Sequence, residues 1–168
     1  CIVRGEYYLE LLPCVLSRAI EASHIKQSGK EAEKAPRESE QLLQKTFDAL
    51  GGAVLVIQSK DGEIIGCNKG AELLFGYKES EIVGLNSEFL NVDRKHFVDF
   101  KAALYPALDR DGIFQTEFHM RRKDGSIFPT ENVVTEILDE SGRRTIVVTV
   151  IRDITARKKV EEALRLEA

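Results

Sequence analysis

The stretch from residue 113 to residue 155 reads IFQTEFHMRRKDGSIFPTENVVTEILDESGRRTIVVTVIRDIT. It is rich in β-branched and aromatic residues, and two turn sequences divide it, KDG at 123–125 and DESG at 139–142. A glycine in such a turn adopts the positive backbone angles that a tight reversal needs. The stretch therefore predicts two successive hairpins, with antiparallel strands at residues 113–122, 126–138 and 143–152.

The residues upstream predict two more strands and a set of helices. Asp61-Gly62 marks a turn between the strands, Asp93 is a suitable cap for the longest helix, and Pro106 is expected to stop it. The expected strands and helices lie at residues 53–58, 63–67, 70–75, 79–83 and 93–104. This order predicts an α+β domain with one antiparallel sheet, in which the inserted helices cover one face and leave a cavity.

Amphipathic helices are predicted on both sides of this domain. Apolar residues at intervals of three and four predict one helix between residues 5 and 25, and a second helix is expected from Pro36 to Leu50. The last segment carries a narrow apolar stripe suited to a coiled-coil partner helix, formed by Ala156, Val160, Ala163 and Leu164. These stripes predict a parallel homodimer through one or both flanking helices.

Composition excludes several classes of function. The 168 residues are 43% hydrophobic and 31% charged, which is typical of one well-buried core. The net charge of -4 comes from mixed charges without a basic patch, so nucleic acid is not an expected partner. No apolar run approaches the roughly 20 residues of a membrane span.

The cysteines and the first residue indicate the setting of the chain. Cys1, Cys14 and Cys67 have spacings that match neither metal-binding nor disulfide motifs, which predicts a reducing, cytoplasmic location. The first residue is not methionine, so we expect a piece of a longer polypeptide.

Several short motifs resemble the PAS family of sensory domains in order and spacing. They are DG at 61–62, Asn68, LFGY at 74–77, EIVG at 81–84, RKDGS at 122–126 and RDIT at 152–155. The resemblance covers residues 46–155 and implies a PAS fold, a five-stranded antiparallel sheet with helices packed on one face. It also implies signal transduction without catalysis. Residues 156–168 are then an exit helix to a covalently linked effector such as a kinase, cyclase or regulator, and Asp153 and Thr155 couple the two.

The N-terminal segment carries a second resemblance. YYLELLP at 7–13, followed by an amphipathic helix, is similar to the last helix of a response-regulator receiver domain. It implies that residues 1–45 are a helical linker that includes the end of a receiver domain, in a two-component system of a bacterium or archaeon.

Comparison with photosensory members of the family argues against flavin. Those members carry a reactive cysteine in the sequence NCRFLQ, whereas this chain has NSEFLN at 86–91, with Ser87 at the cysteine position. A hydroxyl has a far higher pKa than a thiol and does not readily form the same adduct. Thr130 and Ile151 replace the asparagine and glutamine that hold a flavin ring.

His96 is the candidate ligand for heme, the other cofactor known in the family. Its predicted helical face also carries Phe100 and Leu104, and neutral imidazole is a competent iron ligand. Thr116, however, stands where some heme-binding members have an arginine. A surface histidine at the start of the helix is the alternative reading.

The resemblance implies that one face of the last three strands points into a cavity. With Phe100 of the long helix, the predicted ligand-pocket residues are Phe100, Phe114, Thr116, Phe118, Thr130, Asn132, Val134, Thr149 and Ile151. Burial of Asn132 without a hydrogen-bond partner would be costly, so we expect a polar ligand or an ordered water next to it. The alternative is that Asn132 lies near a strand edge that is exposed to solvent. The side chains at these positions are apolar or uncharged, so they do not form a group of residues that could catalyse a reaction or bind a metal.

The sequence therefore predicts a non-enzymatic sensory module of a two-component-type protein. It is expected to bind a small ligand, to dimerise, or to do both, and so to relay a signal to an output domain. Two alternatives stay open at this point: a passive dimerisation module without a ligand, and a heme-based sensor that uses His96.

Overall fold

The computed structural model describes residues 36–49 and 51–167. The predicted helix at residues 5–25 and the receiver-like segment lie outside the described residues. The elements in chain order are α2 (Pro36–Ala49), β1 (Ala53–Gln58), β2 (Ile64–Cys67), α3 (Lys69–Phe75), α4 (Glu79–Ile82), the 3-10 helix η1 (Ser87–Leu90), α5 (Arg94–Asp111), β3 (Ile113–Arg121), β4 (Ile127–Leu138), β5 (Arg144–Asp153) and α6 (Thr155–Leu166).

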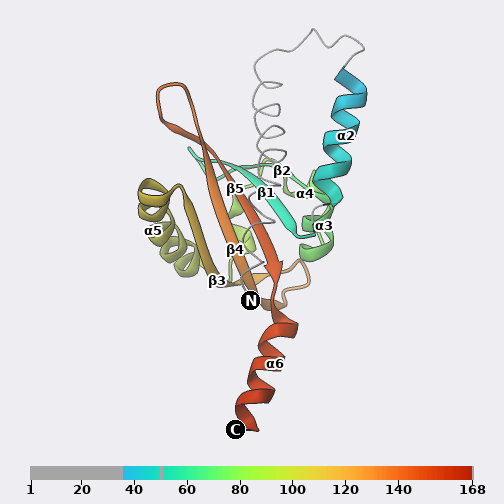
Figure 1. Cartoon of the computed structure of the whole chain (residues 1–168), viewed down its shortest axis with the longest axis vertical. Coiled ribbons are helices and arrows are strands. Elements are labelled where there is room, and N and C mark those ends of the chain that lie inside the picture. Colours follow the sequence, from blue (N-terminus) through green and yellow to red (C-terminus); the bar gives the residue numbers. More distant parts are fainter. Residues whose placement is uncertain (1–35, 50, 168) are drawn as a thin grey trace.

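The strands form one antiparallel sheet in the order β2-β1-β5-β4-β3, which confirms the predicted α+β class (Figure 1). Both predicted hairpins are present. Gly125 and Gly142 have φ angles of 85° and 78°, a region that residues with a side chain rarely adopt. Pairing of β1 with β5 joins the N-terminal hairpin to the three-stranded unit and places β5 in the middle of the sheet.

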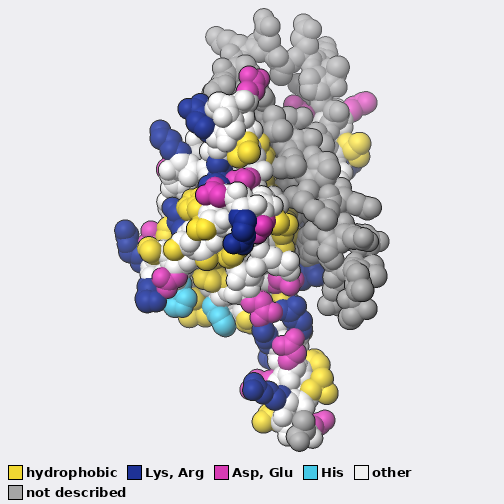
Figure 2. Space-filling view, turned by 60° about the vertical axis from the view of Figure 1, so that its left-hand side comes forward, with side chains coloured by type: hydrophobic (Ala, Val, Ile, Leu, Met, Phe, Trp, Pro, Cys, Tyr) yellow, Lys and Arg dark blue, Asp and Glu magenta, His cyan; other side chains and the backbone are white. Residues whose placement is uncertain are grey.

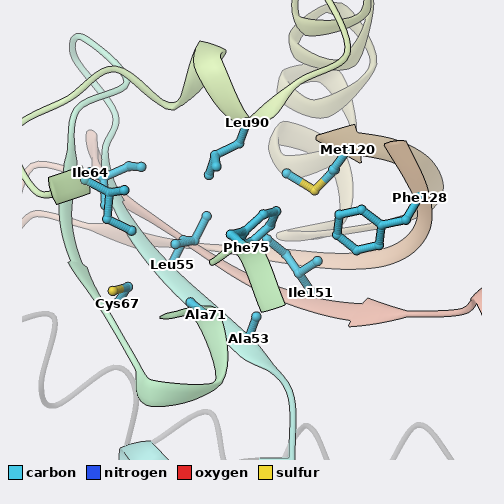
Figure 3. Packing of buried hydrophobic residues seen from close by; sticks show 11 residues of the cluster. Ala53, Leu55, Ile64, Cys67, Ala71, Phe75, Leu90, Met120, Phe128 and Ile151 are labelled. Carbon is cyan, nitrogen blue, oxygen red and sulfur yellow. The ribbon is translucent and has the colours of Figure 1, made fainter. Parts of the chain in front are cut away.

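The main core lies between the sheet and the helices inserted between β2 and β3. Figure 3 shows Leu90 of η1 pointing toward Leu55 on the sheet, with Phe75 of α3 beside them. The buried residues of this core are Ala53, Leu55, Ile64, Cys67, Ala71, Phe75, Ile82, Leu90, Met120, Phe128 and Ile151. Removing this apolar surface from water is the main force that holds the helices on the sheet.

A second cluster lies on the opposite face of the sheet. Phe47 of α2 is 1% exposed and packs with strand residues whose side chains alternate with those of the main core. These residues are Val54, Val56, Ile146 and Val148. The sheet therefore has an apolar cluster on each face, with the inserted helices on one face and the end of α2 on the other.

Helix α5 corrects one prediction. It continues through Pro106 to Asp111 instead of stopping at the proline. Proline removes one main-chain donor and frees the carbonyl four residues earlier, but Pro106 and that residue, Ala102, are exposed, so water can bind the carbonyl. Leu104 and Leu108, on either side of the proline, are 5% and 1% exposed, and their packing holds the helix together.

Within the described residues, no helix combines the length and apolar character that a membrane crossing needs.

Candidate functional site

A small cavity lies between the sheet and the segment that contains η1 and the start of α5. Its lining residues are Leu55, Ile57, Ser87, Leu90, Asn91, Phe97, Phe100, Phe118, Met120, Asn132, Thr149 and Ile151. The space open to the centres of water-sized molecules is about 40 Å³. One water needs roughly 10–15 Å³ by this measure, so the cavity holds about three waters or one organic molecule of similar size.

Five of the predicted pocket residues line this cavity: Phe100, Phe118, Asn132, Thr149 and Ile151. Strand pairing brings them together, because Asn132 lies opposite Ile151 in the β4–β5 pair and alternate residues of a strand share a face. Phe100 reaches the same space from α5, and its ring centroid is 4.9 Å from that of Phe118.

The other four predicted residues do not line the cavity. Phe114 and Val134 belong to a neighbouring apolar cluster with Leu104, Leu108 and Val147 of α5 and β5. The Thr116 hydroxyl donates a hydrogen bond to the Glu117 carbonyl at 3.3 Å. Thr130 is buried and is not a lining residue, and its hydroxyl oxygen accepts a hydrogen bond from Asn132.

Sequence reasoning missed several lining residues. Leu55 and Ile57 lie on β1, whose continuous apolar run gives no alternation from which to choose a face. Ser87, Leu90 and Asn91 lie in or next to η1, and one turn of 3-10 helix has no periodic signal. Met120 shares the strand face of Phe118 by alternation but was not among the predicted pocket residues, and Phe97 of α5 completes the set.

A short chain of hydrogen bonds orders the polar wall of the cavity. The Thr130 hydroxyl donates to the Phe118 carbonyl oxygen at 2.6 Å, and Nδ2 of Asn132 donates to the Thr130 hydroxyl oxygen at 2.8 Å. Asn132 is 1% exposed and Thr130 is fully buried. These bonds fix the orientation of the Asn132 carboxamide.

The geometry of His96 does not favour the iron-ligand alternative. The side chain is 48% exposed, and its Nδ1 lies 2.8 Å from Oδ1 of Asp93. The main-chain N–H and then the ring of His96 hold the pKa of Asp93 below its usual value. His96 is not among the lining residues, and a porphyrin is many times larger than the cavity. Within the described residues, no group of three or more His, Cys, Asp or Glu side chains is placed to hold a metal ion.

The end of β5 connects this cavity to α6. Oδ1 of Asp153 accepts hydrogen bonds from the main-chain N–H of Thr155 at 2.8 Å and from its hydroxyl at 2.6 Å. Oδ2 forms an ion pair with Arg122 at 2.6 Å, and the Arg122 guanidinium stacks 3.5 Å from the Phe128 ring centroid. Partial burial opposes ionisation of Asp153, but Thr155 and Arg122 hold its pKa below the usual value.

Ion pairs also join the start of α6 to strands β3 and β4 of the sheet. Arg157 contacts Glu117 and Glu131, and Lys158 contacts Glu117. Glu117 is exposed and Glu131 is half-buried, and both are ion-pair partners of α6. The Lys158 hydrogen bond holds the pKa of Glu117 below its usual value.

Residues 52–156 match a protein family described as PAS domain. The bacterioopsin transcriptional activator of Halobacterium salinarum is 29% identical over 133 residues, which are 77% of this chain and 20% of that protein. Two-component system protein A of Emericella nidulans is 32% identical over 103 residues, 61% of this chain and 15% of that protein. The chain thus spans about a fifth or less of the length of these relatives.

Among solved structures, the PAS domain of a Colwellia psychrerythraea protein is 28% identical to this chain with a TM-score of 0.65. The match covers 70% of this chain and 98% of that one.

Proposed function

Because the chain belongs to the PAS domain family through residues 52–156, we propose that it is the sensory module of a two-component-type signalling protein. A small ligand in the cavity changes the state of a covalently linked effector through α6. A transcriptional activator and a two-component system protein among the relatives support a regulatory role.

The observation that carries this proposal is that strand β5 both lines the cavity and contacts the start of α6. Thr149 and Ile151 of β5 line the cavity, and Asp153, two residues further along the strand, accepts the main-chain N–H of Thr155, the first residue of α6. A displacement of β5 by a ligand therefore reaches this hydrogen bond directly. A signal requires that the ligand bind the two positions of β5 with different affinities.

A measurement without any ligand tests this relay. Ile151→Val removes one methyl group from the cavity wall, and Asp153→Ala removes the acceptor of the Thr155 N–H. Loss of one hydrogen bond costs about 1 kcal/mol net, so Asp153→Ala is expected to speed hydrogen exchange at the first α6 amides roughly fivefold. We expect Ile151→Val to change α6 exchange in the wild-type background and to have no effect when Asp153 is alanine.

Asp139 provides the matched control. Its Oδ1 accepts from the main-chain N–H and hydroxyl of Ser141 at 2.9 and 2.6 Å, which is the arrangement of Asp153 with Thr155, but in a hairpin turn. Asp139→Ala is expected to leave the effect of Ile151→Val on α6 intact. Unchanged α6 exchange in Ile151→Val alone would show that β5 carries no such relay.

Dimerisation is the second candidate, and the surface of α6 favours it. The helix has no buried residue, and Val160, Leu164 and Leu166 are 59%, 63% and 82% exposed. Figure 2 shows hydrophobic side chains on this projecting helix. Light scattering at tens of micromolar is expected to give a homodimer that Leu164→Gln weakens. Glu162→Gln, on the opposite side of the helix, is the control, and a monomeric wild type would reject the dimer.

A further inference from the structure

The side-chain oxygen of Asn132 has no hydrogen-bond partner within the described residues. Thr130 Oγ1 is 2.6 Å from the Phe118 carbonyl oxygen, and a carbonyl has no proton to give, so the single Thr130 hydroxyl proton is used in that bond. Thr130 can therefore only accept from Asn132. The carboxamide must turn its Nδ2 toward Thr130, and its Oδ1 is left as an open acceptor.

This open acceptor is in a place where a partner is needed. Asn132 is 1% exposed and lines the cavity. A buried carbonyl oxygen without a donor is costly, and nearly all such groups in folded proteins have a partner. Within the described residues, the side-chain atoms that are fully buried without a partner are Thr135 Oγ1 and Arg157 Nε. Asn132 Oδ1 is not among them, so it is reached from the cavity that Asn132 lines, and its donor comes from the contents of that cavity.

The remaining polar groups of the cavity are all uncharged. Besides Asn132, the lining has the hydroxyls of Ser87 and Thr149 and the side chain of Asn91, whose Nδ2 donates to the Ser87 carbonyl at 3.1 Å. Among the residues that the structure describes, no lysine, arginine, histidine, aspartate or glutamate lines it. An ion that entered would lose its water without gaining a counter-charge, which is strongly unfavourable.

The Lys101 ammonium, which lies near the lining residue Phe97, is engaged by aromatic rings. The Lys101 ammonium lies 5.2 Å from the centroid of the Phe97 ring and 5.6 Å from that of Tyr105. Lys101 is not itself a lining residue, so it does not supply a counter-ion for an anion held at Asn132.

From this chemistry we propose that the cavity selects a small uncharged molecule that carries an N–H or O–H donor for Oδ1 of Asn132. The proposal rests on the proposed sensory function, since it specifies the ligand of the same cavity. With room for about three waters, the cavity fits a primary amide or an alcohol of a few heavy atoms. The apolar part of the ligand lies against Leu55, Phe100 and Ile151.

Three probes of nearly equal shape and different charge test this selection. Acetamide is neutral, acetate carries a negative charge and acetamidinium a positive charge. Molecules of this size bind weakly, so each is titrated to about 100 mM at constant ionic strength into the 15N-labelled chain. We expect saturable shifts of the Asn132 side-chain amide with acetamide and at least tenfold weaker binding of both ions.

Two substitutions locate the binding. Asn132→Leu is expected to weaken acetamide binding at least tenfold, with a native-like spectrum as the check on folding. Gln115→Leu removes an exposed carboxamide from the neighbouring strand and is expected to bind acetamide as the wild type does. Unchanged acetamide binding by a folded Asn132→Leu variant would overturn the role of Asn132.

The wild-type titrations decide the proposal even if Asn132→Leu does not fold. Equal or tighter binding of acetate or acetamidinium would overturn the selection for neutral ligands and leave the sensory function standing. If none of the three probes gives saturable shifts, the inference is wrong, while the ligand-free exchange measurement on α6 decides the relay separately.

Discussion

Replacing Asn68 with alanine is expected to destabilise the domain by about 3–4 kcal/mol. The side chain is 1% exposed. Its Oδ1 accepts from the N–H groups of Val54 and Ala71 at 2.8 and 2.9 Å, and its Nδ2 donates to the carbonyls of Phe47 and Gly52 at 3.1 and 2.9 Å. One side chain thus joins the end of α2, the start of β1 and the start of α3.

The magnitude follows from the groups that alanine leaves behind. The Ala71 N–H also contacts the Asn68 main-chain carbonyl at 3.1 Å, so it keeps a partner. The Val54 N–H and the carbonyl oxygens of Phe47 and Gly52 each lose their hydrogen bond to the Asn68 side chain. At about 1 kcal/mol for each net hydrogen bond, plus a smaller term for polar groups left buried, the sum is a large part of the 5–15 kcal/mol that stabilises a typical domain.

Urea unfolding followed by circular dichroism measures this change. The midpoint is expected to fall while the slope of free energy against urea stays constant. Asn86 is the control, since it is an exposed asparagine that accepts from the Glu88 N–H at 2.9 Å, and Asn86→Ala is expected to cost about 1 kcal/mol. A loss for Asn68→Ala no larger than that for Asn86→Ala would refute the reasoning from the buried network.

Three further predictions concern single sites. A Cβ at Gly70 would lie 2.4 Å from the Gly52 carbonyl oxygen, so Gly70→Ala is expected to cost about 2 kcal/mol in urea unfolding. Gly51→Ala, with no atom within 4 Å of the added Cβ, is its neutral control. Hydrogen bonds from the Ser141 hydroxyl and the main-chain N–H of Arg143 lower the pKa of Asp139 to about 2. Asp139 should therefore stay ionised as pH falls to that value, and Ser141→Ala should raise its pKa in an NMR titration; a midpoint near the usual 3.8 in the wild type would contradict this. Pro106→Ala restores a main-chain donor in α5 and is expected to stabilise the domain by about 1–2 kcal/mol, and a lower urea midpoint would contradict that expectation.

Local rules of the chain sufficed for the positions of the strands along the sequence and for the two hairpins. The turn glycines and the apolar runs of residues 113–152 predicted the two hairpins, because turn chemistry and side-chain alternation act over a few neighbouring residues. Motifs such as LFGY and RDIT pointed to the PAS family, to which residues 52–156 belong. Asp93 was correctly identified as a helix cap, since its carboxylate accepts from the His96 N–H at 2.8 Å.

The sequence by itself therefore determined the family, the sheet and the strand face on which Asn132 and Thr149 lie. Only the tertiary structure decided which side chains share the cavity. Phe114 and Thr116 have the expected parity but lie nearer the start of β3 than the lining residue Phe118. At that end of the strand, Phe114 packs against Leu104 and Leu108 of α5. The continuation of α5 through Pro106 likewise depends on packing against the sheet. Such outcomes depend on contacts between residues far apart in the chain, which dihedral preferences and short-range periodicity do not encode.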